Sequence, residues 1–248
     1  MDTIKSENEA GFPRTLWSRI DAVKGGDSTE REEALNFLAR RYWKPVYLFV
    51  RQYGHNEEEA QDLVQDFFVA ALARDLFAKA DPTKGRFRNL LLTSLKRFLA
   101  NANRNARAKK RHPVEGFVTI QELMTESGPV IVPKDTRTPD EAFHRNWLRE
   151  LVLRVLRALE LECEATGKQL HLELLRVRII LPLLEGAEAP SLRDLGERHG
   201  LSDKDVENRV ITARLAYQRL LRKEIRLYAG SDEEVAEEIQ DIWRFMVE

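Results

Sequence analysis

Hydrophobic residues recur every three or four positions along most of the chain, which is the spacing of amphipathic α-helices. The first three such stretches cover residues 12–23, 28–53 and 56–72. Pro45 lies inside the second stretch and predicts a kink or break near Trp43, because proline lacks an amide donor and clashes with the preceding turn. The pattern as a whole predicts an all-α fold.

The third stretch carries an acidic, amide-rich face. Asn56 is a good N-cap, and Glu59 is placed to close a capping box. Opposite the apolar stripe lie Glu58, Gln61, Asp62 and Gln65. Taken alone, such a face is best explained as solvated surface. Because a strongly basic segment follows closely in the sequence, we instead expect one module with two charged surfaces for two partners.

The basic segment covers residues 84–112, with ten lysines and arginines and no acidic residue. Leu91, Leu95 and Leu99 form an apolar stripe at helical spacing. Polar and cationic residues lie mostly on the other side: Asn89, Lys96, Arg97, Asn103, Arg104 and Arg107. A helix with one buried and one cationic face suits a polyanion, because neutralising phosphates releases counterions. A solvated basic helix is the alternative, but the lack of balancing acids favours nucleic acid.

Residues 113–138 contain repeated proline and glycine and no sustained helical period, which predicts a flexible linker. Thr138 and Glu141 then open a second helical domain with a capping box. We therefore expect two small helical domains, residues 12–112 and 139–228. An acidic amphipathic helix at 229–248 is expected to pack back on the second domain; a docking helix for a partner is the alternative.

Residues 191–225 have the pattern of a helix-turn-helix motif. Ser191 and Ser202 are placed to cap the two helices, and Gly200 allows the sharp turn between them. The second helix would be free to enter a major groove, although helical hairpins that bind only protein can share this turn. The expected DNA contacts are Ser202, Lys204, Asn208, Arg209, Thr212 and Arg214.

The composition excludes several classes of protein. The formal net charge is −1, and hydrophobic residues make up 43% of the chain, enough for real cores. No apolar run reaches the roughly 18 to 20 residues that span a bilayer, so we expect no membrane insertion. The single cysteine, Cys163, excludes an internal disulfide and fits a reducing cytoplasm. No metal-site spacing, cofactor motif or nucleophile–base pair is recognisable, so we expect no metal, no cofactor and no enzymatic activity.

In this order, the motifs resemble those of an extracytoplasmic-function sigma factor of bacterial RNA polymerase. EEEAQDLVQDFF, residues 57–68, is similar to the family helix that docks on the clamp helices of core polymerase. GRFRNLLLTSLKRFLANANR, residues 85–104, is similar to the segment that melts and reads the minus-ten promoter element. Residues 191–225 are similar to the reader of the minus-thirty-five element. The chain departs from residues common in the family at Gln61, Leu90 and Glu207.

The resemblance implies a sigma domain two, a flexible linker and a helix-turn-helix sigma domain four. It places Glu58, Glu59, Gln61, Asp62 and Gln65 against the β′ clamp helices of core RNA polymerase, and the β flap is a second expected contact. It adds Lys84, Arg86, Phe87 and Arg88 to the minus-ten contacts. Phe87 is a candidate for base stacking or, equally, for the core. Promoter DNA is the second partner, and the resemblance also allows an anti-sigma factor.

Two other functions fit the same residues. A stand-alone helix-turn-helix regulator would bind duplex DNA tightly without polymerase. A sigma-like adaptor would bind protein and not DNA, and its binding would be insensitive to added salt.

Overall fold

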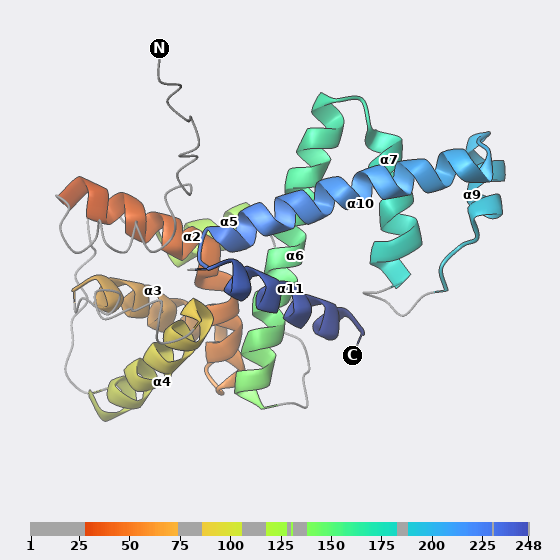
Figure 1. Ribbon diagram of the computed structural model, residues 1–248. Coiled ribbons are helices and arrows are strands. Elements are labelled where there is room, and N and C mark those ends of the chain that lie inside the picture. The colour runs from red at the N-terminus through yellow and green to blue at the C-terminus, as the bar shows by residue number, and fades with distance from the viewer. Residues whose placement is uncertain are drawn as a thin grey trace, which may run out of the picture.

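The computed structural model describes residues 28–73, 86–105, 118–127, 130, 138–182, 188–229 and 231–247. Within these ranges the chain forms helices and no strand, which confirms the predicted all-α class (Figure 1). The helix expected at residues 12–23 lies outside the described residues. The helices are α2 (Ser28–Gln52), α3 (Glu57–Ala73), α4 (Phe87–Asn105), α5 (Ile120–Ser127), α6 (Pro139–Ala165), α7 (Gln169–Leu175) with its π-helical continuation η2 (Arg176–Ile180), α9 (Leu192–His199), α10 (Asp203–Arg226) and α11 (Asp232–Val247).

Reciprocal side-chain caps set the starts of several helices. At α3 the Glu59 amide donates to Asn56 Oδ1 at 2.9 Å, and the Asn56 amide donates to Glu59 Oε2 at 3.2 Å. Thr138 and Glu141 form a capping box at α6. These contacts satisfy backbone donors that a helix leaves unpaired at its start, so the predicted helix starts are confirmed.

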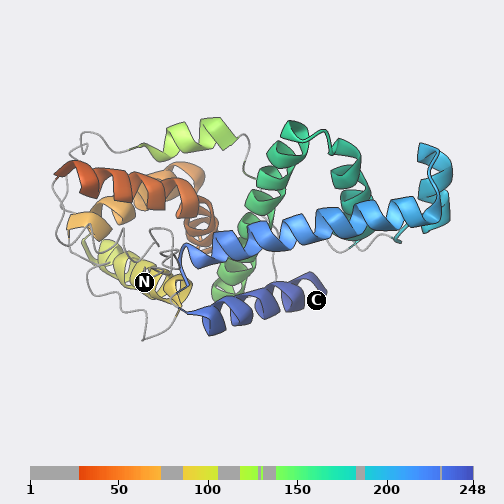
Figure 2. The ribbon, with the colours of Figure 1, turned by 45° about the horizontal axis from the view of Figure 1, so that its top comes forward.

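Helix α2 is continuous and contains Pro45 in its interior. Its ribbon changes direction partway along in both views (Figures 1 and 2). Proline interrupts the ladder of helical hydrogen bonds, which is the usual cause of such a kink. The bend lets α2 contact both α3 and α6.

The main hydrophobic core contains residues from both halves of the chain. The Tyr42 ring of α2 stacks on the Trp147 ring of α6, with centroids 4.5 Å apart and planes 5° apart. Phe49 meets Phe143 edge to face at 6.0 Å. The two parts expected to be separate domains thus pack directly on one another through α2 and α6.

Part of the segment predicted to be a flexible linker, residues 113–138, forms helix α5. The Thr119 amide donates to Glu122 Oε2 at 2.9 Å, and the Glu122 amide donates to Thr119 Oγ1 at 3.2 Å. Ile120 and Leu123 are buried, and α5 packs against α3. Two turns of helix are too short for a periodic pattern to stand out, so only the capping pair marks this helix in the sequence.

A second, smaller core lies at the outer end of α10, where Leu174, Leu195, Val206 and Val210 are buried together. The long helix α10 runs from this small core, beside α9, to the main core, where it contacts α6 and α11 (Figure 2). Helix α11 packs back on α10 and α6, as expected for the acidic helix. Among the described helices, none is long and apolar enough to cross a membrane.

Candidate polymerase and nucleic-acid interfaces

The first two turns of α3 present the acidic face. Glu57, Glu58 and Glu59 are exposed, and Asp62 is half-buried. Carboxylates at a helix N-terminus are stabilised by the helix dipole, so this end of α3 can hold concentrated negative charge. The face is therefore available to a basic partner.

Two amide residues of the predicted set, Gln61 and Gln65, are half-buried, as Asp62 is, and are less accessible than the three glutamates. Gln65 Oε1 accepts a hydrogen bond of 2.9 Å from the Ile120 amide, at the start of α5. The structure therefore uses Gln65 to hold α5 against α3, a role that the sequence pattern did not indicate.

Helix α4 buries one face and exposes the other. Phe87, Leu91, Leu95 and Leu99 are buried, whereas Asn89, Lys96 and Arg97 are exposed. Lys96 Nζ lies 2.6 Å from Asp140 Oδ2 at the start of α6. Three further predicted contacts have side chains outside the description: Asn103 and Arg104, whose backbone lies in the last turn of α4, and Arg107. Lys84 also lies outside the described residues.

Phe87 belongs to the core. Its ring is fully buried, with its centroid 5.3 Å from that of Tyr42 and 6.2 Å from that of Trp147. A base cannot stack on this ring in the arrangement described, so of the two roles considered for Phe87 the structure has the core role.

Arg86 and Arg88, called the arginine pair below, lie at the start of α4 and contact acidic residues of α11. Arg88 Nη1 donates to Glu238 Oε2 at 3.1 Å, and Arg86 Nη2 donates to Glu237 Oε2 at 2.9 Å. Asp241 forms hydrogen-bonded ion pairs with both arginines. Arg88 is only 6% exposed and Glu238 is 0% exposed. The arginine pair is thus covered by three carboxylates from more than 140 residues further along the chain.

In this environment the pKa values of two α11 carboxylates, Glu238 and Asp241, shift in opposite directions. Burial raises the pKa of Glu238, although the nearby Arg88 and Arg86 oppose the shift. Desolvation acts to raise the pKa of Asp241 too, but hydrogen bonds from Arg88 and Arg86 outweigh it and hold that pKa below its usual value. Glu238 is the member of the cluster for which burial dominates.

The sequence contained a signal for this contact. Glu238 lies three residues after Val235 and four before Ile242, both buried, so it lies on the apolar face of α11. An acid on a buried helix face requires a paired base, because an unpaired buried charge is strongly unfavourable. That position predicts a basic partner, although it does not say which one.

The segment predicted to be a helix-turn-helix consists of two helices, α9 and α10, joined by a tight turn. Gly200 adopts a left-handed conformation with φ 65°, and the Ser202 side chain caps α10 through the Asp205 amide. The turn also requires a residue without a side chain at Gly196, because a Cβ at that position would lie 2.6 Å from the Leu201 carbonyl oxygen. Gly196 could not be singled out from the sequence, because a glycine inside a helix pattern has no turn signature of its own.

Most of the predicted contacts on this hairpin are exposed, namely Ser202, Lys204, Asn208, Thr212 and Arg214, and Arg209 is half-buried. Arg209 Nη1 lies 3.9 Å from Asp205 Oδ1 on the same helix. The exposed Asp203 and Glu207 share this end of α10, so its charge is mixed. Ile211 and Leu215 are exposed on the same helix at 46% and 60%.

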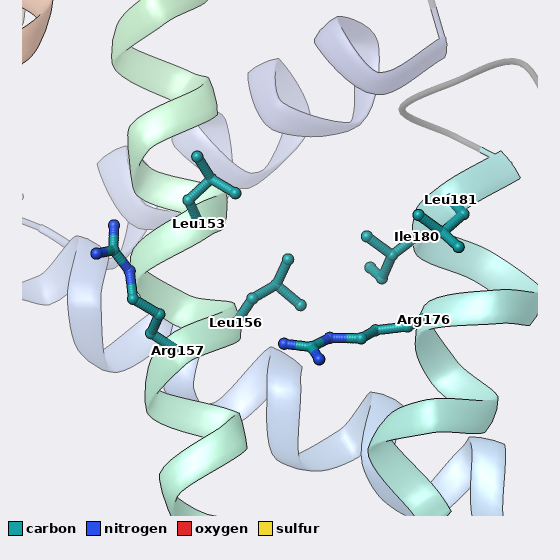
Figure 3. Close-up of a pocket in the computed structure, with 6 residues that line it drawn as sticks. All are labelled: Leu153, Leu156, Arg157, Arg176, Ile180 and Leu181. Atoms are coloured by element: carbon teal, nitrogen blue, oxygen red, sulfur yellow. The ribbon is translucent and has the colours of Figure 1, made fainter. Parts of the chain in front are cut away.

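A pocket of about 380 Å³ lies between α6 and η2 (Figure 3). Leucine and isoleucine side chains line it, with Arg157 on one side and Arg176 reaching toward Leu156 from the other. Arg176 Nη2 forms an ion pair of 3.2 Å with Glu160. None of the residues predicted for the polymerase or DNA contacts lines this pocket. Within the described residues, no cluster of three or more metal-ligating side chains occurs.

Comparison with known proteins gives one match. Residues 38–109 match the family described as Sigma-70 region 2. The matched segment contains the acidic face of α3, the arginine pair and the exposed face of α4. No curated protein and no solved structure matches the chain.

Proposed function

We propose, from the premise that residues 38–109 belong to the sigma-70 region 2 family, that this protein is a sigma factor of the extracytoplasmic-function group. In this role it binds core RNA polymerase in the bacterial cytoplasm and directs it to specific promoters. The role requires recognition surfaces and no catalytic centre or cofactor in the protein itself. The observation that carries the proposal is the pairing, within the matched segment, of an acidic helix face on α3 with a cationic face on α4.

The acidic face of α3 is proposed to dock on the β′ clamp helices of core polymerase. Glu58, Glu59 and Asp62 would supply the charge complementary to a basic surface, and Gln61 would add hydrogen bonds. Complementary charge mainly raises the association rate and fixes the orientation of the complex. Gln65 would contribute indirectly by keeping α5 in place through its bond to the Ile120 amide.

The exposed face of α4 is proposed to hold the opened strand of the minus-ten element. Asn89, Lys96 and Arg97 are exposed there and offer one amide and two cations. Extruding a base costs a few kcal/mol, which contacts to the backbone and to base edges must offset. Phe87 contributes by anchoring α4 in the core and not by stacking on a base.

The α9–α10 hairpin is proposed to read duplex DNA at the minus-thirty-five element. Lys204, Asn208 and Arg214 are exposed along the first half of α10 and would supply the contacts. Asp203 and Glu207 would oppose nearby phosphates, unless one of them accepts a hydrogen bond from a cytosine amine. The β flap of polymerase is the second surface proposed to contact this part of the chain.

The decisive experiment is transcription by reconstituted polymerase. Transcript starts are first mapped after induced expression of the protein, and the strongest start supplies a promoter template. Purified protein with core polymerase is expected to give a specific transcript from that template, and core polymerase alone is not. Equal initiation with and without the protein would contradict the proposal.

A sigma-like adaptor is the second candidate, and one observation favours it for the hairpin. The exposed Ile211 and Leu215, together with the acids Asp203 and Glu207, suit a protein surface better than phosphates. Salt dependence separates the two roles, because release of counterions makes DNA binding weaken steeply with salt. Binding of the hairpin to polymerase, with no effect of promoter sequence upstream of the minus-ten element, would support the adaptor.

A further inference from the structure

We propose that α11 is an internal cover of the DNA-binding surface, whose carboxylates occupy the arginine pair in place of DNA phosphates. This inference rests on the proposed function, because it assumes that α4 binds single-stranded promoter DNA. It adds that the chain exists in a closed form, in which α11 lies on Arg86 and Arg88, and that DNA and α11 compete for these side chains.

The start of α4 is a natural site for anions. The positive end of the helix dipole lies there, and two guanidinium groups add two full charges. Three carboxylates fill this site: Glu237 on Arg86, Glu238 on Arg88, and Asp241 between the two arginines. Arginine recognises carboxylate and phosphate oxygens with the same planar fork of donors, so one kind of anion can replace the other.

The closed form excludes DNA from the arginine pair. With only 6% of its surface exposed, Arg88 cannot reach a phosphate until α11 moves. Arg86 is only partly accessible, and its guanidinium engages Glu237 and Asp241. A polyanion must therefore displace α11 to gain both contacts.

Some interactions of α11 stabilise the closed form and others oppose it. A cover that opens reversibly requires both. Val235 and Ile242 hold α11 on the core through their buried side chains. Against this, Glu238 is fully buried, and its Oε1 atom accepts no hydrogen bond among the described residues, although Arg86 Nε lies 3.8 Å away. A buried carboxylate with one unsatisfied oxygen reduces the net gain from the ion pairs.

In other ion pairs between the two halves, too, the first half supplies the base and the second half supplies the acid. Arg41 pairs with Glu224 of α10, Lys44 with Glu150 of α6 at 3.0 Å, and Lys96 with Asp140 of α6 at 2.6 Å. In each of these three pairs α2 or α4 supplies the base and a later helix supplies the acid. The second half of the chain thus neutralises cations of the first half, and Lys96 is a proposed DNA contact that is also engaged in this way.

The test compares two variants of the full-length protein with equal charge changes on α11. Glu238→Gln with Asp241→Asn removes two carboxylates that hold the arginine pair. Asp232→Asn with Glu233→Gln removes two exposed carboxylates at the start of the same helix, of which Asp232 pairs with Arg226 at 3.2 Å. Each protein is titrated onto a labelled single-stranded oligonucleotide over a range of salt concentrations, and amide hydrogen exchange in α11 is measured without DNA.

The first variant is expected to bind the oligonucleotide about tenfold more tightly than the second, with a salt slope steeper by about 1.4, since each phosphate contact to a single strand contributes about 0.7. Exchange in α11 should be faster in the first variant only. Adding Arg88→Ala to the first variant should remove part of the gain in affinity. Equal affinities of the two variants, or a gain that persists in full without Arg88, would overturn the proposal.

Failure of the proposed cover and failure of the proposed sigma-factor function would give different results. If the cover does not exist, the two α11 variants bind alike while the wild-type protein still directs core polymerase to its promoter. If the protein is not a sigma factor, the wild type gives no specific transcript with core polymerase, whatever the α11 variants do. Hydrogen exchange reports on the cover without reference to polymerase or promoter.

Discussion

Helix α4 and the hairpin end of α10, both proposed to contact DNA, differ in the source of the acids that oppose their cations. On α4, Arg88 and Lys96 pair with acids of α11 and α6, far away in the sequence. On α10, Arg209 lies 3.9 Å from Asp205, one turn earlier on the same helix. The positive charge of α4 can therefore be released when another helix moves, whereas the mixed charge at the hairpin end of α10 is fixed by the sequence of α10 itself.

Helix α4 is anchored in a core that both halves of the chain share, and Trp147→Ala is the strongest test of this anchoring. The substitution removes a ring that contacts Tyr42, Phe87 and Tyr228. We expect the free energy of unfolding to fall by about 3–5 kcal/mol, as for a large buried aromatic. Urea denaturation followed by circular dichroism measures it.

Trp243→Ala is the matched control, because this tryptophan is 40% exposed on α11. It should change the free energy of unfolding by less than about 1 kcal/mol. Two unfolding transitions, with only one shifted by Trp147→Ala, would show that the halves do not share a core.

A substitution in the hairpin at the outer end of α10 should instead destabilise only the hairpin itself. Gly196→Ala places a methyl group 2.6 Å from the Leu201 carbonyl oxygen, so the turn must shift. We expect a cost of about 1–3 kcal/mol, with faster amide exchange confined to α9 and the first half of α10. Arg193→Ala, at an exposed site on the same helix, should stay within about 0.5 kcal/mol. Faster exchange spreading into α4 would contradict the separation of the two regions.

Within the first half of the chain, the acidic face of α3 and the basic face of α4 should be separable by substitution. Asp62→Lys should weaken binding to core polymerase and leave binding to a single-stranded oligonucleotide unchanged or slightly stronger. Arg97→Ala should spare polymerase binding and reduce the salt slope for the oligonucleotide by about 0.7. Polymerase pull-down and fluorescence anisotropy measure the two effects. If both variants lose the same activity, the assignment of the two faces is wrong.

The smallest expected effect is a dependence of the stability of the hairpin on pH. Hydrogen bonds from Ser191 and Ser202 lower the pKa values of Asp194 and Asp205 below the ordinary value of 3.8. A depressed pKa in the folded state stabilises the hairpin above the unfolded-state pKa, and that stability is lost as the pH falls through the folded-state pKa. The protection of amides in α9 and α10 against exchange, relative to the unfolded chain at the same pH, should therefore fall below about pH 4. Ser202→Ala should remove the Asp205 share of this effect, and an unchanged pH profile in that variant would contradict it.

Much of the fold could be predicted because its determinants are local. Apolar spacing and the caps at Asn56, Thr138, Ser191 and Ser202 locate helices within a few residues, since each cap acts on the turn that follows it. The acidic and basic faces of α3 and α4 follow from the same spacing. Helix α5 could not be recognised in this way because it is only eight residues long.

The packing between the halves could not be predicted, because it depends on contacts between residues distant in sequence. Nothing near Tyr42 indicates that its ring stacks on Trp147, and nothing near Arg88 indicates that its partner is Glu238. The exposure of a cationic residue depends on such contacts. A run of basic residues thus predicts a polyanion partner, but it does not reveal that an acidic helix of the same chain already occupies part of the site.

The continuous helix α10 sets a distance. Its 24 residues span about 36 Å, with the hairpin at one end and contacts to α11 near the other. One turn of B-form DNA has about the same length. While α10 stays docked on α6, its length keeps the hairpin roughly one DNA helical repeat away from the end of α10 that is followed by α11. Two promoter elements spaced further apart than this could be bound together only after α10 has separated from α6.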